Sequence, residues 1–156
     1  MCVRWIATWL FVIFAFAWAG PVSAAEGLVV KSSTYGVAET VDRLETALGE
    51  KGITVLARVD HAANAASAGM DLPPTELLIF GNPKLGTPLM QSEREVGIDL
   101  PMKALVWEDE DGDVFLAYNE PAWFARRHGI GDRGQVIEKM AGALDALTDA
   151  AVADAH

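Results

Sequence analysis

Apolar residues recur along the chain at two spacings, and the spacing distinguishes expected helices from expected strands. In residues 36–51 they fall three and four positions apart, which predicts an amphipathic helix whose buried stripe is Val37, Val41, Leu44 and Leu48. Short apolar or β-branched runs predict strands at 28–33, 53–59, 75–80, 102–110 and 113–119. Further helices are expected at 61–66, 87–96 and 122–127.

The last helix is expected to begin at Asp132, with Gln135 as a capping-box-like partner. Its apolar stripe is Val136, Met140, Leu144 and Leu147. The alanine-rich tail, residues 149–156, is expected to fray. This order predicts an α+β (α/β-like) fold, in which helices pack on a single mixed sheet of about five strands. A C-terminal β-hairpin followed by two helices completes it.

The hairpin has the clearest turn signal. Asp111-Gly112 stands between two apolar-rich runs and predicts a two-residue turn, which would set Trp107 opposite Leu116. This register predicts that one face meets the helices, formed by Leu105, Trp107, Val114, Leu116 and Tyr118.

The first residues have the layout of a signal peptide, predicted over residues 1–25. One positive charge in Met1–Arg4 precedes an apolar run, Trp5–Ala19, and small residues follow at 22–25. The run is shorter than the ~20 residues that span a bilayer, and cleavage fits equally well after Ala24 or Ala25. A single mature domain, residues 26–156, is then expected in the periplasm or outside the cell. The alternative is an uncleaved N-terminal anchor.

Composition narrows the classes of function. The only cysteine, Cys2, lies in the segment expected to be removed, so the mature domain would have no disulfide or thiol chemistry. The chain has 12 basic and 22 acidic residues and a formal charge of −10. This charge disfavours nucleic acid and anionic membranes as partners.

The stretch "FGNPKLGTPLM", from Phe80 to Met90, is the first candidate site. Thr87-Pro88 is typical of a helix start, and free N–H groups at such a start attract anions. Lys84 lies nearby. The loop is either a plain strand-to-helix turn or a site for a small anionic or polar ligand.

The remaining motifs do not indicate a functional site. The acidic run Glu108–Asp113 does not match a calcium loop and is expected to be a solvated hairpin tip. The histidines His61, His128 and His156 have no metal-site spacing, and no serine lies in a Gly-x-Ser-x-Gly motif. No catalytic residue, metal or cofactor is therefore assigned.

Three motifs carry a family resemblance: "FGNPKLGTPLMQ", "GIDLPMKALVWEDEDGDVFLAYNEP" and "RRHG". From about Val30 to Leu147 the chain resembles the domain-of-unknown-function 302 family. The resemblance implies a compact α/β domain that forms a homodimer, and it brings no catalytic residue. The motifs group a hypothetical ligand-binding set: Asn82, Lys84, Gly86, Thr87, Asp99, Lys103, Tyr118, Asn119 and His128. We expect these residues to share one edge of the sheet.

The leading interpretation is an exported, non-catalytic binding or accessory module. One alternative is a small enzyme with acid–base chemistry at the Asn82–Thr87 loop, using Lys84, Asp99 or His128. Another is a structural homodimer without a ligand.

Overall fold

A computed structural model describes residues 25–153 of the chain. The predicted signal peptide lies outside the described residues, apart from Ala25. The elements follow one another as β1 (Leu28–Ser33), α1 (Val37–Glu50), β2 (Thr54–Asp60), α2 (His61–Ser67), β3 (Thr75–Gly81), α3 (Pro83–Ser92), the 3₁₀ helix η1 (Arg94–Ile98), β4 (Met102–Glu108), β5 (Val114–Asn119), α4 (Pro121–Arg127) and α5 (Gly134–Val152).

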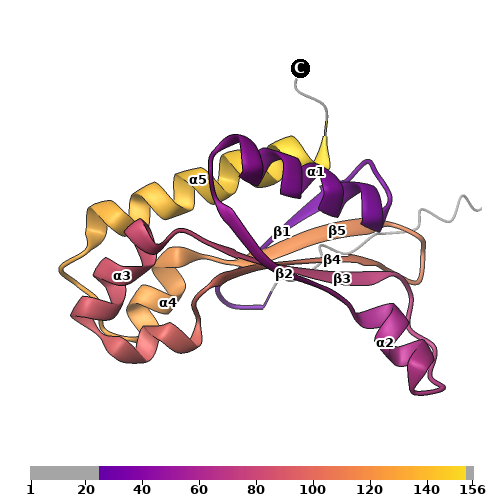
Figure 1. Cartoon of the computed structure of the whole chain (residues 1–156), viewed down its shortest axis with the longest axis horizontal. Coiled ribbons are helices and arrows are strands. Elements are labelled where there is room, and N and C mark those ends of the chain that lie inside the picture. The colour runs from indigo at the N-terminus through magenta and orange to yellow at the C-terminus, as the bar shows by residue number, and fades with distance from the viewer. Residues whose placement is uncertain (1–24, 154–156) are drawn as a thin grey trace, which may run out of the picture.

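The five strands form one sheet in the order β1-β5-β4-β3-β2 (Figure 1). The predicted α+β class, the strand number and the hairpin followed by two helices are confirmed. The expectation of a mixed sheet is wrong, because every neighbouring pair of strands is antiparallel. Strands β2, β3, β4 and β5 lie next to one another in sequence order, and β1 forms the outer strand beside β5.

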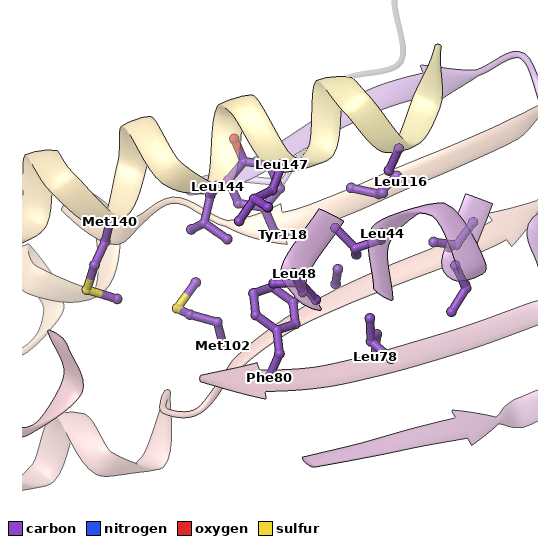
Figure 2. Packing of buried hydrophobic residues seen from close by; sticks show 14 of the residues in the cluster. Leu44, Leu48, Leu78, Phe80, Met102, Leu116, Tyr118, Met140, Leu144 and Leu147 are labelled. Atoms are coloured by element: carbon purple, nitrogen blue, oxygen red, sulfur yellow. The ribbon is translucent and has the colours of Figure 1, made fainter. Parts of the chain in front are cut away.

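Helices α1 and α5 lie side by side over the same face of the sheet (Figure 1). The apolar stripe predicted for α1 is fully or almost fully buried there. Figure 2 shows the core between these layers, where Leu44 and Leu48 of α1 meet Leu78 and Phe80 of β3. Burial of these large side chains is the main force that holds the helices on the sheet.

The hairpin turn is one residue longer than predicted. The backbone N–H of Asp109 donates to the carbonyl of Asp113 at 2.9 Å, which leaves three residues, 110–112, in the loop. Asp109 Oδ1 accepts the backbone N–H groups of Asp111 and Asp113 at 3.0 and 2.9 Å. Gly112 takes a φ of 84°, which glycine adopts without strain. The Asp109 side chain thus stabilises the longer turn.

This extra residue shifts the hairpin register by one. Trp107 pairs with Phe115 instead of Leu116. A one-residue shift exchanges the two faces of a strand, so Leu105 and Trp107 do not point at the helices as predicted. The helix-covered face instead carries the buried residues Met102, Ala104, Val106, Val114, Leu116 and Tyr118.

Helix α3 begins earlier than predicted. Its N-cap is Asn82, its first residue is Pro83, and Pro88 lies inside the helix. The expected start at Thr87 is therefore wrong. Asn82-Pro83 obeys the same start rule as Thr87-Pro88, and the earlier start packs Leu85 and Leu89 against the core.

Helix α5 begins at Gly134, and its N-cap, Arg133, makes no side-chain capping bond. Asp132 does not cap it as predicted, because its carboxylate accepts the Ser92 hydroxyl instead. This hydrogen bond holds the pKa of Asp132 below its ordinary value. At the other end α5 continues to Val152, which is buried, beyond the point at which the sequence predicts fraying.

Candidate functional site

The loop singled out in the sequence forms one wall of a pocket of about 410 Å³. The other walls are the start of β2, the segment before β4, and α5. The floor is apolar and buried: Phe80, Met102, Met140, Leu144 and Leu147. Figure 2 shows these side chains converging from the sheet and from α5. The volume falls within the ~300–1,000 Å³ range of small-molecule sites.

The rim of the pocket combines exposed apolar and polar side chains. Leu56 is 57 % exposed and Met90 is 37 % exposed. The polar residues at the rim are Thr54, Asn82 and Thr87. Thr54 begins β2 and pairs with Gly81, the last residue of β3. Asn82 directly follows Gly81, so Thr54 and Asn82 lie at the same edge of the sheet. The pocket therefore has a dry floor and polar groups at its edge.

The backbone donors at the start of α3 already have partners within the chain. The N–H of Lys84 donates to Asn82 Oδ1 at 2.9 Å, and those of Leu85 and Gly86 donate to the Asn82 carbonyl. Pro83 has no N–H. Asn82 alone thus accepts the first N–H groups of α3, which are the groups on which an anion site at a helix start depends.

The predicted ligand set divides into separate groups. Asn82, Gly86 and Thr87 line the pocket, whereas Lys84 is exposed on the same helix and is not part of the lining. In the sheet, the ends of β3 and β5 flank the start of β4. Whether any of these residues binds a ligand stays a prediction.

A second group gathers around Asp99. Its carboxylate lies 2.6 Å from His128 Nε2 and 3.1 Å from Arg127 Nη1. Lys103 Nζ donates to the backbone carbonyls of Asp99 and Pro101 at 3.3 and 3.1 Å. The Asp99 and His128 side chains are only 10 % and 8 % exposed. Three predicted residues thus form one polar cluster, which Leu100 and Pro101 connect to the pocket lining.

The last two predicted residues belong to neither group. Tyr118 is buried on the helix-covered face and interacts with Thr148 of α5 and with Lys31. Asn119 is exposed at the end of β5, where it pairs with Leu28.

Sequence reasoning missed the apolar walls of the pocket. Met140, Leu144 and Leu147 were assigned only to the core stripe of the last helix, because a stripe that lines a pocket has the same spacing as one that packs. A weak signal was present in Met90, Met102 and Met140, because flexible methionines are common where a surface must adapt to a ligand.

A family model described as "Domain of unknown function DUF302" matches residues 29–147. The chain belongs to the DUF302 family. This confirms the resemblance carried by the three sequence motifs, and the match includes both the pocket loop and the Asp99 cluster. The family description names no activity.

A solved structure supports the DUF302 fold. The crystal structure of the uncharacterized conserved protein DUF302 from Bacillus stearothermophilus matches with a TM-score of 0.73 and 22 % sequence identity. The match covers 81 % of this chain and 99 % of that one. At this identity the likeness concerns the fold alone.

Curated relatives carry a different name. Two proteins, each called "Fluoride-specific ion channel FluC 1", come from Brucella suis biovar 1 (strain 1330) and Brucella abortus biovar 1 (strain 9-941). Each is 48 % identical over 129 residues, which make up 82 % of this chain and 51 % and 48 % of theirs. The DUF302 chain thus spans about half the length of these relatives. Within residues 25–153, no helix combines the length and apolar character that a membrane span requires.

Proposed function

We propose that this DUF302 chain is a non-catalytic binding module that holds a small molecule in the pocket between α3 and α5. The observation that carries the proposal is the pocket itself, with about 410 Å³ and a buried apolar floor. Apolar surface in contact with water is unfavourable, so a ligand that covers the apolar lining of this pocket gains stability. An apolar lining also gives water few hydrogen-bond partners, which favours its displacement by a ligand.

The module is exported in this proposal, which rests on the layout of residues 1–25. It acts in the periplasm or outside the cell, away from nucleic acid. The channel relatives support an accessory role, because each contains a second part of similar length that this chain does not match. We assign the channel activity in their name to that second part, and ligand binding to the part shared with this chain.

A thermal-shift screen tests the binding proposal. The full chain is produced with residues 1–25 in place, purified as the host leaves it, and screened against small apolar, polar and anionic compounds. A ligand that binds only the folded state raises the melting temperature, by an amount that grows with its concentration. Ala143→Phe adds a ring to the pocket wall on α5 and should abolish the shift.

Ala146→Phe is the matched control. It adds the same ring three residues along α5, at an exposed position outside the pocket. It should keep the wild-type shift. No shift with any compound, or an equal shift in the two variants, would contradict binding in this pocket.

The Asp99–His128 pair favours a second candidate function, a small enzyme with acid–base chemistry. A histidine held by a carboxylate at 2.6 Å has the geometry of an oriented general base. The enzyme would turn over a substrate in a screen of model esters and phosphate esters, and His128→Gln would abolish that turnover. Activity that is absent, or unchanged in His128→Gln, counts against it.

The protein also forms a homodimer in this proposal, with a second copy as the partner. The face of the sheet opposite α1 and α5 carries the half-buried side chains Leu77, Ile79, Leu105, Trp107 and Phe115. An apolar face of this extent is typical of a protein–protein contact. Its central position is Leu105, because β4 is the middle strand of the five.

Sedimentation analysis tests the dimer. The wild type should have twice the monomer mass, and Leu105→Arg should be monomeric because it places a charge in the contact. Ala146→Arg, exposed on α5, is the control and should remain a dimer. If the protein is a purely structural dimer, sedimentation gives the same result, and no compound raises the melting temperature in the thermal-shift screen.

A further inference from the structure

We infer that the pocket ligand is a single-chain amphiphile, a molecule with one unbranched hydrocarbon chain and one small polar end. This inference rests on the proposed binding function and names its ligand class. It follows from the length of the pocket, the chemistry of its walls and the position of its polar groups.

The lining of the pocket extends along α5. Its wall on this helix runs from Met140 to Leu147, about two helical turns or roughly 10 Å. Residues from Asn82 to Met90 of α3 form the facing wall. A slot between two helices accepts a flexible chain along its length. A volume of about 410 Å³ lies near the lower end of small-molecule sites, which favours one chain over two.

The walls suit a hydrocarbon chain. Apart from Phe80, the glycines and the polar residues at the rim, the lining consists of aliphatic or methionine side chains. Three methionines, Met90, Met102 and Met140, come from three different parts of the fold. Unbranched methionine side chains adjust to irregular shapes, so they pack against a chain that bends. In the described lining we find no charged side chain. A charged group at the floor would therefore lose its hydration without a partner.

The polar end belongs at the rim beside Asn82 and Thr54. These residues lie at the same end of neighbouring strands, and both have exposed or half-exposed side chains. Lys84 is exposed in the first turn of α3, next to Asn82. A small headgroup at this rim stays in contact with water while the chain occupies the slot. An anionic headgroup would gain attraction from Lys84, and a neutral one would not.

The test compares chains of increasing length with two headgroups. The full chain, stripped of bound lipid on a hydrophobic resin, is titrated with octanoate, decanoate, dodecanoate and tetradecanoate, and with the monoacylglycerols of the same chains. Displacement of the fluorescent dye ANS reports binding. Each added methylene is expected to lower Kd about threefold to fourfold until the chain outgrows the slot.

Three variants and one control variant locate the ligand. Ala143→Phe should weaken binding at least tenfold, whereas Ala146→Phe should bind as the wild type does. Leu56→Asp adds a charge at a rim position that is 57 % exposed and should weaken binding several-fold. Lys84→Ala should weaken the fatty acids and leave the monoacylglycerols unchanged, because only the fatty acids carry an anionic headgroup. Equal effects on both series would contradict the placement of the headgroup beside Lys84.

Negative results of two kinds distinguish the inference of an amphiphile from the proposal that the pocket binds a ligand. If compact or polar compounds stabilise the wild type but not Ala143→Phe, and Kd is independent of chain length, the amphiphile is excluded and binding in the pocket stands. If no compound binds, or if Ala143→Phe and Ala146→Phe bind all compounds equally, both proposals are overturned. Native mass spectrometry of the chain as purified adds a direct result, because a retained single-chain lipid supports the inference and a retained peptide contradicts it.

Discussion

His128 Nε2 lies 2.6 Å from Asp99 Oδ2, although 28 residues separate them along the chain and both side chains are about nine-tenths buried. Asp99 directly follows η1, and His128 directly follows α4. The bond therefore joins the segment before β4 to the helix after β5. Because it is shielded from water, it should contribute more to stability than the more exposed ion pair between Asp99 and Arg127.

We expect Asp99→Ala to lower the free energy of unfolding by about 2–3 kcal/mol, because it leaves buried His128 without its partner. Arg127→Ala should cost no more than about 1 kcal/mol, since the Arg127 side chain is half exposed. Urea unfolding of the single variants, and of Asp99→Ala with His128→Ala, measures the coupling of the pair. Equal costs for Asp99→Ala and Arg127→Ala would contradict the ranking.

Arg43 of α1 holds the C-terminal end of α5. Its Nε donates to the carbonyl of Ala151 at 3.2 Å, and its Nη2 donates to those of Ala150 and Ala153, each at 3.1 Å. The last carbonyls of a helix have no partner within it and carry the negative end of its dipole. The same guanidinium lies over the ring of Tyr35, 4.1 Å from its centre.

Arg43→Ala should therefore destabilise the protein by about 2 kcal/mol, and most of the loss should appear in the last turn of α5. Hydrogen exchange resolved by residue measures the fraying, and urea unfolding measures the total. Arg43→Lys keeps the charge but not the planar fork, so an intermediate loss is expected. Unchanged exchange near Val152 in Arg43→Ala would show that α5 does not depend on this contact.

The sequence predicted the elements whose signals are local. The apolar run Leu77-Leu78-Ile79-Phe80 is short and favours a strand, and the stripe of α1 leaves one face to bury. The sequence did not decide where α3 starts, because Asn82-Pro83 and Thr87-Pro88 both have an N-cap residue followed by proline at the first helical position. Packing of Leu85 and Leu89 decides between them, and such packing depends on residues far along the chain.

The candidate site was predictable only in part for the same reason. The motifs grouped Asp99 with His128, but their contact depends on how α4 packs after β5. The pocket was not predicted, because Met140 and Leu144 have the spacing of ordinary core residues. A hollow is the space that side chains leave unfilled, and the sequence pattern records only which faces are apolar.

The hairpin tip provides a direct test of the turn that the sequence mispredicted. Asp109 Oδ1 accepts the N–H groups of Asp111 and Asp113, so Asp109→Ala should cost about 1–2 kcal/mol in urea unfolding. Asp109→Asn keeps an acceptor oxygen and should cost less. Asp111→Ala, at an exposed position in the loop, should be close to neutral. If Asp111→Ala were the more damaging change, the side chain of Asp109 would not be what holds the longer turn.

Alkaline pH should destabilise the protein through two neighbouring groups. Burial lowers the pKa of Lys31, but hydrogen bonds to Asp145 and Asp149 outweigh it, so this pKa lies above its ordinary value of 10.5. Burial raises the pKa of the Tyr118 phenol above its ordinary value of 10.0. In both cases the folded state holds its proton more tightly than the unfolded state does.

The stability from both groups is therefore complete below pH 10 and is lost as the pH rises through the two raised pKa values. Urea unfolding between about pH 9 and pH 11.5, a range set by roughly one unit on either side of these ordinary values, should show a plateau followed by a fall. Tyr118→Phe cannot ionise, so its curve should fall less steeply than that of the wild type. Lys31→Met should also flatten the curve but lower the plateau, because it breaks the contacts with Asp145 and Asp149 at every pH in the range. A fall that is equally steep in wild type and both variants would assign the alkaline transition to groups elsewhere in the chain.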